Sequence, residues 1–192
     1  MNLPNMLTVL RVFLTVIFIF FLHHDGFEAK LLALLAFTLA VLSDYLDGYY
    51  ARKLNLITAF GKIMDPIADK LLMLSAFFIF STMHIIAGWM FIVICAREVI
   101  VTGLRLAAIP RGITLAAEKA GKVKTVLQII AVYLIIIFII LAQCHVNAQW
   151  YGALMSSLAG GIRIFMAGVV VITLWSGLTF IWNNRKELFS VR

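Results

Sequence analysis

Long apolar stretches alternate with short polar breaks along the whole chain. Six of these stretches are long enough, or nearly so, to cross a bilayer as helices, which requires roughly 20 apolar residues. They cover approximately residues 6–22, 31–50, 70–86, 87–108, 125–142 and 162–182. The first has the short apolar core of a secretory signal, but no small-residue cleavage pattern follows it, so we interpret it as a retained helix. The pattern predicts an all-α membrane protein, with six transmembrane helices in a single domain over residues 1–192.

The composition identifies lipid as the main solvent of these stretches. Of the 192 residues, 64% are apolar and 13% are charged, whereas a soluble domain has about 45–50% and about 25%. One core of this size cannot hide so many apolar side chains from water. A soluble globular domain, a disordered tail and a disulfide-stapled secreted module are therefore excluded. The two cysteines, Cys95 and Cys144, lie within or beside apolar runs and indicate neither a disulfide framework nor a metal-binding cluster.

The basic residues predict the orientation in the membrane. If the N-terminus is cytoplasmic and six helices alternate, fourteen of the 16 Lys and Arg residues fall on the cytoplasmic side, and only Lys30 and Arg163 fall opposite. This is a clear positive-inside bias, so we expect both termini in the cytoplasm. The net charge of +7 then reflects topology and attraction to anionic lipid. We find no motif that favours binding to nucleic acid.

Four aspartates lie where the second apolar stretch ends and the third begins. Asp44 and Asp47 are three residues apart, and Asp65 and Asp69 are four apart, so each pair shares one helix face. The connection between them is short, and we expect the two faces to turn toward each other. An Asp inside a span costs about 2.5–3.5 kcal/mol on insertion scales, which indicates a functional reason for these residues. Converging carboxylates without nearby His or Cys favour Mg²⁺ or Mn²⁺, and a two-metal site is typical of phosphoryl transfer.

The residues around the aspartates suit a phosphate-containing ligand. Gly48 and Gly61 leave room for a bulky nucleotide near the backbone, and Arg52 offers a planar fork for phosphate. Pro66 directly after Asp65 is compatible with two local structures. Either Asp65 caps a helix that starts at Pro66, or Pro66 bends a helix that began near Thr58.

The full pattern is Asp44-x2-Asp47-Gly48-x2-Ala51-Arg52-x8-Gly61-x3-Asp65-x3-Asp69. It resembles the signature of the CDP-alcohol phosphatidyltransferase family at all eight fixed positions. The resemblance implies six transmembrane helices, usually in a homodimer, with a polar cavity open to the cytoplasm. It also implies transfer of a phosphatidyl or similar group from a CDP-linked donor to an alcohol, with release of CMP.

The resemblance assigns roles to individual positions. It implies two metal ions held by Asp44, Asp47, Asp65 and Asp69, with Asp69 also acting as the general base on the acceptor hydroxyl. The pocket for the CDP-diacylglycerol donor would be lined by Gly48, Ala51, Arg52 and Gly61. Asn5 and Thr8 join this pocket through the opening Asn5-x2-Thr8-x2-Arg11, which also looks like that of the family.

A second polar cluster predicts the acceptor. Arg97 and Arg105 lie on one span, eight residues apart, and point within about 80° of each other. An Arg inside a span faces the bundle interior or water, so these two can form a basic pocket with Lys122 and Lys124 that fits a phosphomonoester dianion. The stretches 96–105, which include Thr102, and 121–125 resemble those of bacterial family members whose acceptor is sn-glycerol 3-phosphate. That resemblance implies glycerol 3-phosphate binding by Arg97, Thr102, Arg105, Lys122 and Lys124, in a bacterial cytoplasmic membrane.

Each assignment has an alternative. The aspartates can pair with Arg52, Lys62 and Lys70, and Arg97 can pair with Glu98 or Glu118. Lys122 and Lys124 can anchor the chain to anionic lipid, and Arg11 can serve only as a topology charge. Within the family, serine, inositol phosphate and phosphatidylglycerol are the other acceptors, and inositol phosphate would also suit a basic pocket. A cation or proton transporter would spread its carboxylates through the bilayer depth, whereas these four cluster near one face.

Overall fold

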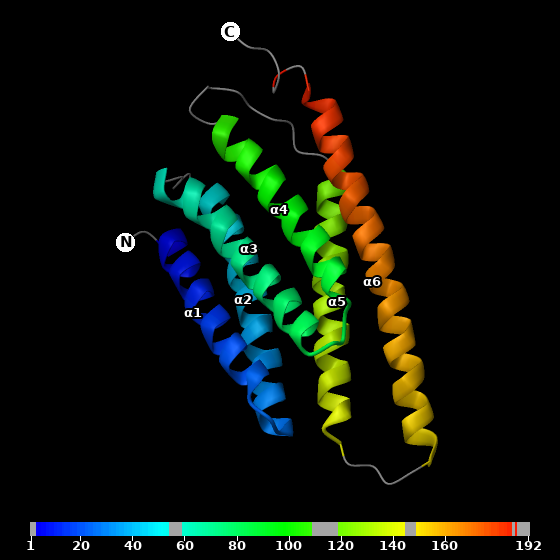
Figure 1. Ribbon diagram of the computed structural model, residues 1–192. Coiled ribbons are helices and arrows are strands. Elements are labelled where there is room, and N and C mark those ends of the chain that lie inside the picture. Colours follow the sequence, from blue (N-terminus) through cyan, green and yellow to red (C-terminus); the bar gives the residue numbers. More distant parts are fainter. Residues whose placement is uncertain (1–2, 54–58, 109–118, 145–148, 186, 188–192) are drawn as a thin grey trace.

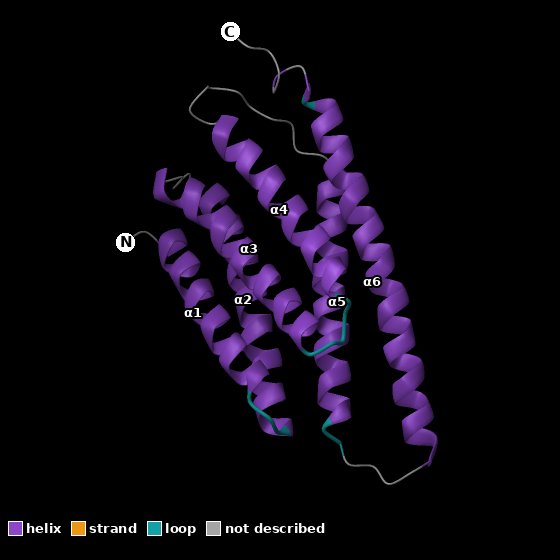
Figure 2. Ribbon diagram, in the orientation of Figure 1, coloured by secondary structure: helices purple, strands orange, loops and turns teal. Residues whose placement is uncertain are grey.

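A computed structural model describes residues 3–53, 59–108, 119–144, 149–185 and 187 of the chain, and all regular elements in these ranges are helices (Figure 2). Six helices are formed: α1 (Leu3–His23), α2 (Phe27–Lys53), α3 (Ala59–Thr82), α4 (Gly88–Ala108), α5 (Lys119–Ala142) and α6 (Gln149–Asn183). The all-α class predicted from the apolar pattern is confirmed. Side chains are described for these helices except at residues 3–5, 47–53, 59–66, 119–120 and 149.

The helices run up and down in alternation and form a ring of neighbours. Going round the bundle, α1 packs on α2, α2 on α5, α5 on α6, α6 on α4, α4 on α3 and α3 back on α1, and α3 also contacts α5 and α2. The beginning of α1 and the end of α6 therefore lie toward the same end of the bundle (Figure 1). The end of α2, the beginning of α3, the end of α4 and the beginning of α5 lie toward that end as well.

The outer faces of the helices are apolar, as in a membrane protein. Met6–His23, Phe27–Leu46, Gly121–Ala142 and Trp150–Asn183 are long and apolar enough to cross a bilayer. The other two helices, α3 and α4, have 24 and 21 residues and carry charged residues within their apolar stretches. Large apolar side chains recur every three or four residues on exposed helix faces, for example Val9, Phe13, Val16 and Phe20 on α1 and Leu31, Leu35, Leu39 and Leu42 on α2. Lipid tails are the environment that suits such surfaces.

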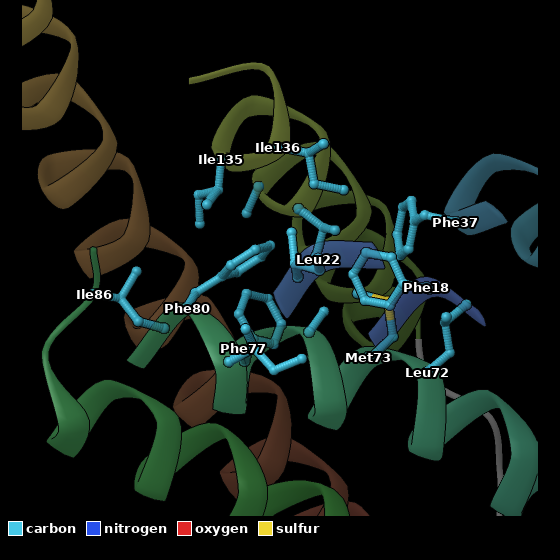
Figure 3. Close-up of a cluster of buried hydrophobic side chains, with 14 of the residues drawn as sticks. Phe18, Leu22, Phe37, Leu72, Met73, Phe77, Phe80, Ile86, Ile135 and Ile136 are labelled. Atoms are coloured by element: carbon cyan, nitrogen blue, oxygen red, sulfur yellow. The ribbon is translucent and has the colours of Figure 1, made fainter. Parts of the chain in front are cut away.

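Apolar side chains from four helices, α1, α2, α3 and α5, pack together in the core (Figure 3). Phe18 of α1 meets Phe37 of α2 with ring centroids 5.5 Å apart, and Phe37 meets Tyr133 of α5 edge-on at 5.2 Å. Phe77 and Phe80 of α3 are fully buried beside them. In lipid the apolar tails offer no hydrophobic driving force between helices, so close packing of this kind holds the bundle together.

The bounds of two helices, α3 and α6, correct the ranges expected from the sequence. The third span was expected at 70–86, but α3 begins at Ala59 and ends at Thr82. Its end is a Schellman motif, in which the Ile85 amide donates to the Phe80 carbonyl and the His84 amide to the Ser81 carbonyl. His84 takes the left-handed conformation that this motif needs, with φ of 57°. Because α3 continues through Asp65 and Pro66, Asp65 does not cap a helix that starts at Pro66. The last span also starts earlier than expected, at Gln149 rather than near residue 162.

A buried lysine joins α1 to α2 at the opposite end of the bundle. The Lys30 ammonium donates to the backbone carbonyls of Leu22 and His24, each at 2.7 Å. These carbonyls lie at or just beyond the end of α1, where intrahelical partners run out. The positive charge also complements the C-terminal end of the helix dipole.

Candidate active site

The aspartate pattern lies on two helices that meet toward one end of the bundle. Asp44, Asp47, Gly48, Ala51 and Arg52 belong to the last part of α2, and Gly61, Asp65 and Asp69 to the first half of α3. Of the eight positions in this pattern, only Asp44 and Asp69 have side chains that the structure describes. The predicted roles of Asn5, Asp47, Gly48, Ala51, Arg52, Gly61 and Asp65 concern side chains outside the described residues.

Asp44 is held by an arginine from α1. Arg11 is buried, and its Nη1 lies 2.7 Å from Oδ1 of the half-exposed Asp44 carboxylate. Thr8, one turn earlier on α1, is also buried. Arg11 is therefore more than a topology charge, because it reaches across to one of the predicted metal ligands. Sequence spacing gave no indication of this pair, since the two residues are 33 positions apart on different helices.

A basic cavity of about 410 Å³ lies between α3, α4 and α5. We call it the basic cavity and define it by its lining residues, which are Asp69, Lys70, Arg97, Arg105, Gly121, Lys122, Lys124, Thr125 and Val126. It brings together Asp69 and four of the five residues proposed from the sequence to bind glycerol 3-phosphate. The fifth, Thr102, lines a neighbouring apolar cavity between α3 and α4, together with Val99 and Gly103.

Three of the five cations of the basic cavity contact Glu98. This carboxylate is buried, and it contacts the Lys70 ammonium at 2.9 Å, Nη1 of Arg97 at 3.3 Å, and the ammonium of Lys124. Lys70 also lies 3.2 Å from the Asp69 carboxylate. The pairing of Arg97 with Glu98, which the sequence offered as an alternative to phosphate binding, is therefore formed. The Arg97 side chain still lines the basic cavity.

Residues of α6 contact both arginines of α4, Arg97 and Arg105, and hold them in place. Nη2 of Arg97 donates to the Ser176 hydroxyl at 2.8 Å, and the guanidinium of Arg105 stacks over the Phe180 ring at 5.1 Å. Gly177 makes room for Arg97, since a Cβ there would lie 3.0 Å from Cγ of Arg97. Sequence reasoning missed these three α6 residues and the central role of Glu98. The adjacent small residues Ser176 and Gly177 inside an apolar span were the signal that would have indicated close packing.

Comparison with known proteins defines the class. The model of the CDP-alcohol phosphatidyltransferase family matches residues 1–182. The chain belongs to this family, which confirms the resemblance drawn from the aspartate pattern and favours a transferase over the transporter alternative.

Relatives of the chain share a more specific name. A Bacillus subtilis protein named CDP-diacylglycerol–glycerol-3-phosphate 3-phosphatidyltransferase is 45% identical over 143 residues, covering 68% of this chain and 74% of its own length. A Rickettsia felis protein of the same name is 33% identical, covering 89% of this chain and 90% of its own length. A probable phosphatidylglycerophosphate synthase of Mycobacterium tuberculosis is 31% identical, covering 100% of this chain and 85% of its own length.

The family is generally dependent on divalent metal ions, and the donor set of this chain fits such an ion. Hard divalent cations prefer carboxylate oxygens, and the pattern supplies four carboxylates from adjoining parts of α2 and α3. The two with described side chains, Asp44 and Asp69, are partly exposed and so accessible to an ion. Within the described residues, no group of three or more potential metal ligands is present.

Proposed function

We propose that this protein transfers the phosphatidyl group of CDP-diacylglycerol to sn-glycerol 3-phosphate, giving phosphatidylglycerophosphate and CMP. The observation that carries the proposal is the basic cavity, in which Asp69 faces the same hollow as Arg97, Arg105, Lys122 and Lys124. An acidic side chain beside a cluster of cations suits an acceptor that combines a hydroxyl with a phosphate. The printed names of the relatives support the same reaction.

The cavity suits a phosphate dianion by charge. It is lined by five cations, Lys70 among them, against the carboxylate of Asp69, and Glu98 adds one further negative charge. Among the described residues, five positive and two negative groups leave an excess of three positive charges, which a phosphomonoester reduces by two. Arginine forks and lysine ammoniums both form charge-assisted hydrogen bonds with phosphate oxygens. Fixing the phosphate in this way would hold the acceptor hydroxyl in place for attack.

In the proposed step, Asp69 accepts the proton of the 1-hydroxyl of glycerol 3-phosphate. The oxygen attacks the phosphorus that carries the diacylglycerol, a new P–O bond forms, and the bond to the CMP phosphate breaks. We propose that Asp44, Asp47, Asp65 and Asp69 hold two Mg²⁺ or Mn²⁺ ions. When bound, such ions neutralise charge on the diphosphate and on the departing CMP. Asn5, Thr8, Gly48, Ala51, Arg52 and Gly61 would bind the CDP part of the donor, and Thr102 would contribute to the acceptor side.

The proposal includes an orientation and an assembly. We propose that both termini and the basic cavity face the cytoplasm of a bacterial cell, with the protein in the cytoplasmic membrane. The distribution of Lys and Arg supports this orientation, and glycerol 3-phosphate and CMP are water-soluble. The acyl chains of donor and product can then stay in the bilayer. A homodimer is proposed from the family resemblance.

The test is CMP release by the detergent-purified protein with CDP-diacylglycerol, Mg²⁺ or Mn²⁺, and a panel of acceptors. The panel contains glycerol 3-phosphate, inositol phosphate, serine and phosphatidylglycerol. The proposal predicts CMP release with glycerol 3-phosphate alone, and loss of release in Asp69→Asn. Release with a different acceptor would keep the transferase but refute the acceptor assignment. Absence of release with every acceptor, from folded protein and with both metals tried, would refute the reaction.

A further inference from the structure

Glu98 has no assigned role in the proposed reaction, yet it is the most connected charged side chain of the described site. Its two carboxylate oxygens divide three cations between them. Oε1 contacts Lys124 and Arg97, and Oε2 contacts Lys70. These cations come from α3, α4 and α5, so one carboxylate ties together the three helices that line the basic cavity.

The same network reaches the proposed general base. Lys70 lies between the two carboxylates, 2.9 Å from Oε2 of Glu98 and 3.2 Å from Oδ2 of Asp69. The cations that would hold the acceptor phosphate are thus connected to Asp69 through one partly buried lysine, Lys70. On the far side, the Ser176 hydroxyl holds the other end of the Arg97 guanidinium at 2.8 Å.

We infer that Glu98 is the positioning residue of the basic cavity: it fixes Lys70, Arg97 and Lys124 in the arrangement that binds the acceptor phosphate beside Asp69. The part of this inference that concerns the KM for glycerol 3-phosphate rests on the proposed function. Glu98 acts through the three cations and contacts neither substrate. The negative charge of Glu98 by itself opposes the binding of an anion in the cavity. Glu98 can favour anion binding only because it orders the three cations.

Two opposed effects make this inference testable. Neutralising Glu98 raises the positive excess of the cavity from three charges to four, given the five lining cations and Asp69. If charge alone mattered, the cavity would bind anions more tightly. If positioning matters, anions bind more weakly, because a glutamine amide turned toward Lys70 or toward Lys124 and Arg97 presents a donor to a cation and displaces it. A misplacement of about 1 Å costs up to the order of 100-fold in rate.

The experiment compares Glu98→Gln and Glu98→Asp with the unchanged protein in detergent. It measures the KM for glycerol 3-phosphate, the KM for CDP-diacylglycerol and kcat, together with the affinity for inorganic phosphate by titration calorimetry. Gln128→Leu is the matched control, since Gln128 is a buried polar residue of α5 that bonds to Thr173 of α6. It breaks a buried polar contact without touching the basic cavity.

We expect Glu98→Gln to raise the KM for glycerol 3-phosphate at least tenfold and to weaken phosphate binding, with the KM for CDP-diacylglycerol within about twofold. Glu98→Asp keeps both acceptor oxygens and should recover part of the loss, which also keeps the test available if the glutamine variant does not fold. Tighter phosphate binding, an unchanged KM, or an equal change in Gln128→Leu would overturn the inference. If the unchanged protein does not use glycerol 3-phosphate, the proposed function fails, and the phosphate titrations alone decide the role of Glu98.

Discussion

Replacing Gly177 by alanine should disturb the acceptor site while leaving the fold intact. The added Cβ would lie 3.0 Å from Cγ and 3.6 Å from Nε of Arg97. Carbon atoms pack best at about 3.5–4.0 Å, so Arg97 must retreat by a few tenths of an ångström. That shift moves the guanidinium relative to Ser176, its partner at 2.8 Å, and to the rest of the basic cavity.

The effects on stability and on activity should separate. Overpacking of this kind costs about 1–3 kcal/mol, but alanine is favoured over glycine inside a helix by about 1 kcal/mol. The net loss in the free energy of unfolding should therefore be about 0–2 kcal/mol. In contrast, displacement of a substrate-positioning group by about 1 Å reduces activity by as much as the order of 100-fold, and the smaller shift expected here should cost about tenfold. We expect a KM for glycerol 3-phosphate raised about tenfold, with only a modest fall in the thermal unfolding midpoint.

The assay is CMP release at varied glycerol 3-phosphate, with the thermal unfolding midpoint in detergent measured in parallel. Gly168→Ala on the same helix is the matched control, because a Cβ there meets nothing within 4 Å. It gains the same helix propensity without approaching Arg97. A KM for glycerol 3-phosphate within twofold of the original in Gly177→Ala would refute the reasoning, as would an equal rise in Gly168→Ala.

Three further predictions concern the base, the metal and the fold. Asp69→Asn should lower the rate of CMP release about 100-fold or more at an unchanged unfolding midpoint, and an active variant would contradict the assignment of the base. Removal of divalent ions with EDTA should abolish CMP release, which Mg²⁺ or Mn²⁺ should restore; activity that survives chelation would contradict the metal site. Lys30→Met should lose two hydrogen bonds to the end of α1, at a cost of about 2–3 kcal/mol. Its unfolding midpoint should fall, with the KM for glycerol 3-phosphate unchanged as the internal control.

The number of helices followed from the apolar pattern because most spans are separated from the next by a polar break. The boundaries were less accurate where charged residues interrupt a helix. Helix α3 begins at Ala59, about eleven residues before the expected start, because its first turns carry Asp65, Pro66 and Asp69. Hydropathy treats such residues as the end of a span, whereas the backbone stays helical. The end of α3 was misplaced for the opposite reason, since residues 85–87 are apolar but lie between the helices, and the expected span ran on to residue 86 rather than ending at Thr82.

The location of the site could also be predicted, but its internal connections could not. Spacing alone placed Arg97 and Arg105 on one helix, and the structure brings both to the cavity that contains Asp69. The contacts of Glu98 join residues up to 28 positions apart, and those of Ser176 and Phe180 cross from α4 to α6. Such contacts depend on how helices pack, and similar apolar surfaces give no sequence signal for which helix meets which.

The charge balance of the basic cavity is easier to explain by function than by stability. A purely structural cluster of buried charges would match its positive and negative groups, because an unpaired buried charge is costly. In the described part of the site, Lys70, Arg97 and Lys124 share the carboxylates of Asp69 and Glu98. The exposed Arg105 and Lys122 add two further cations to the same cavity. The bundle supports this excess with contacts from outside the cavity, which include the Ser176 hydroxyl on Arg97 and the Phe180 ring under Arg105. A fold that retains unbalanced cations and orders them in advance is suited to a ligand that brings negative charge, as an incoming phosphate would.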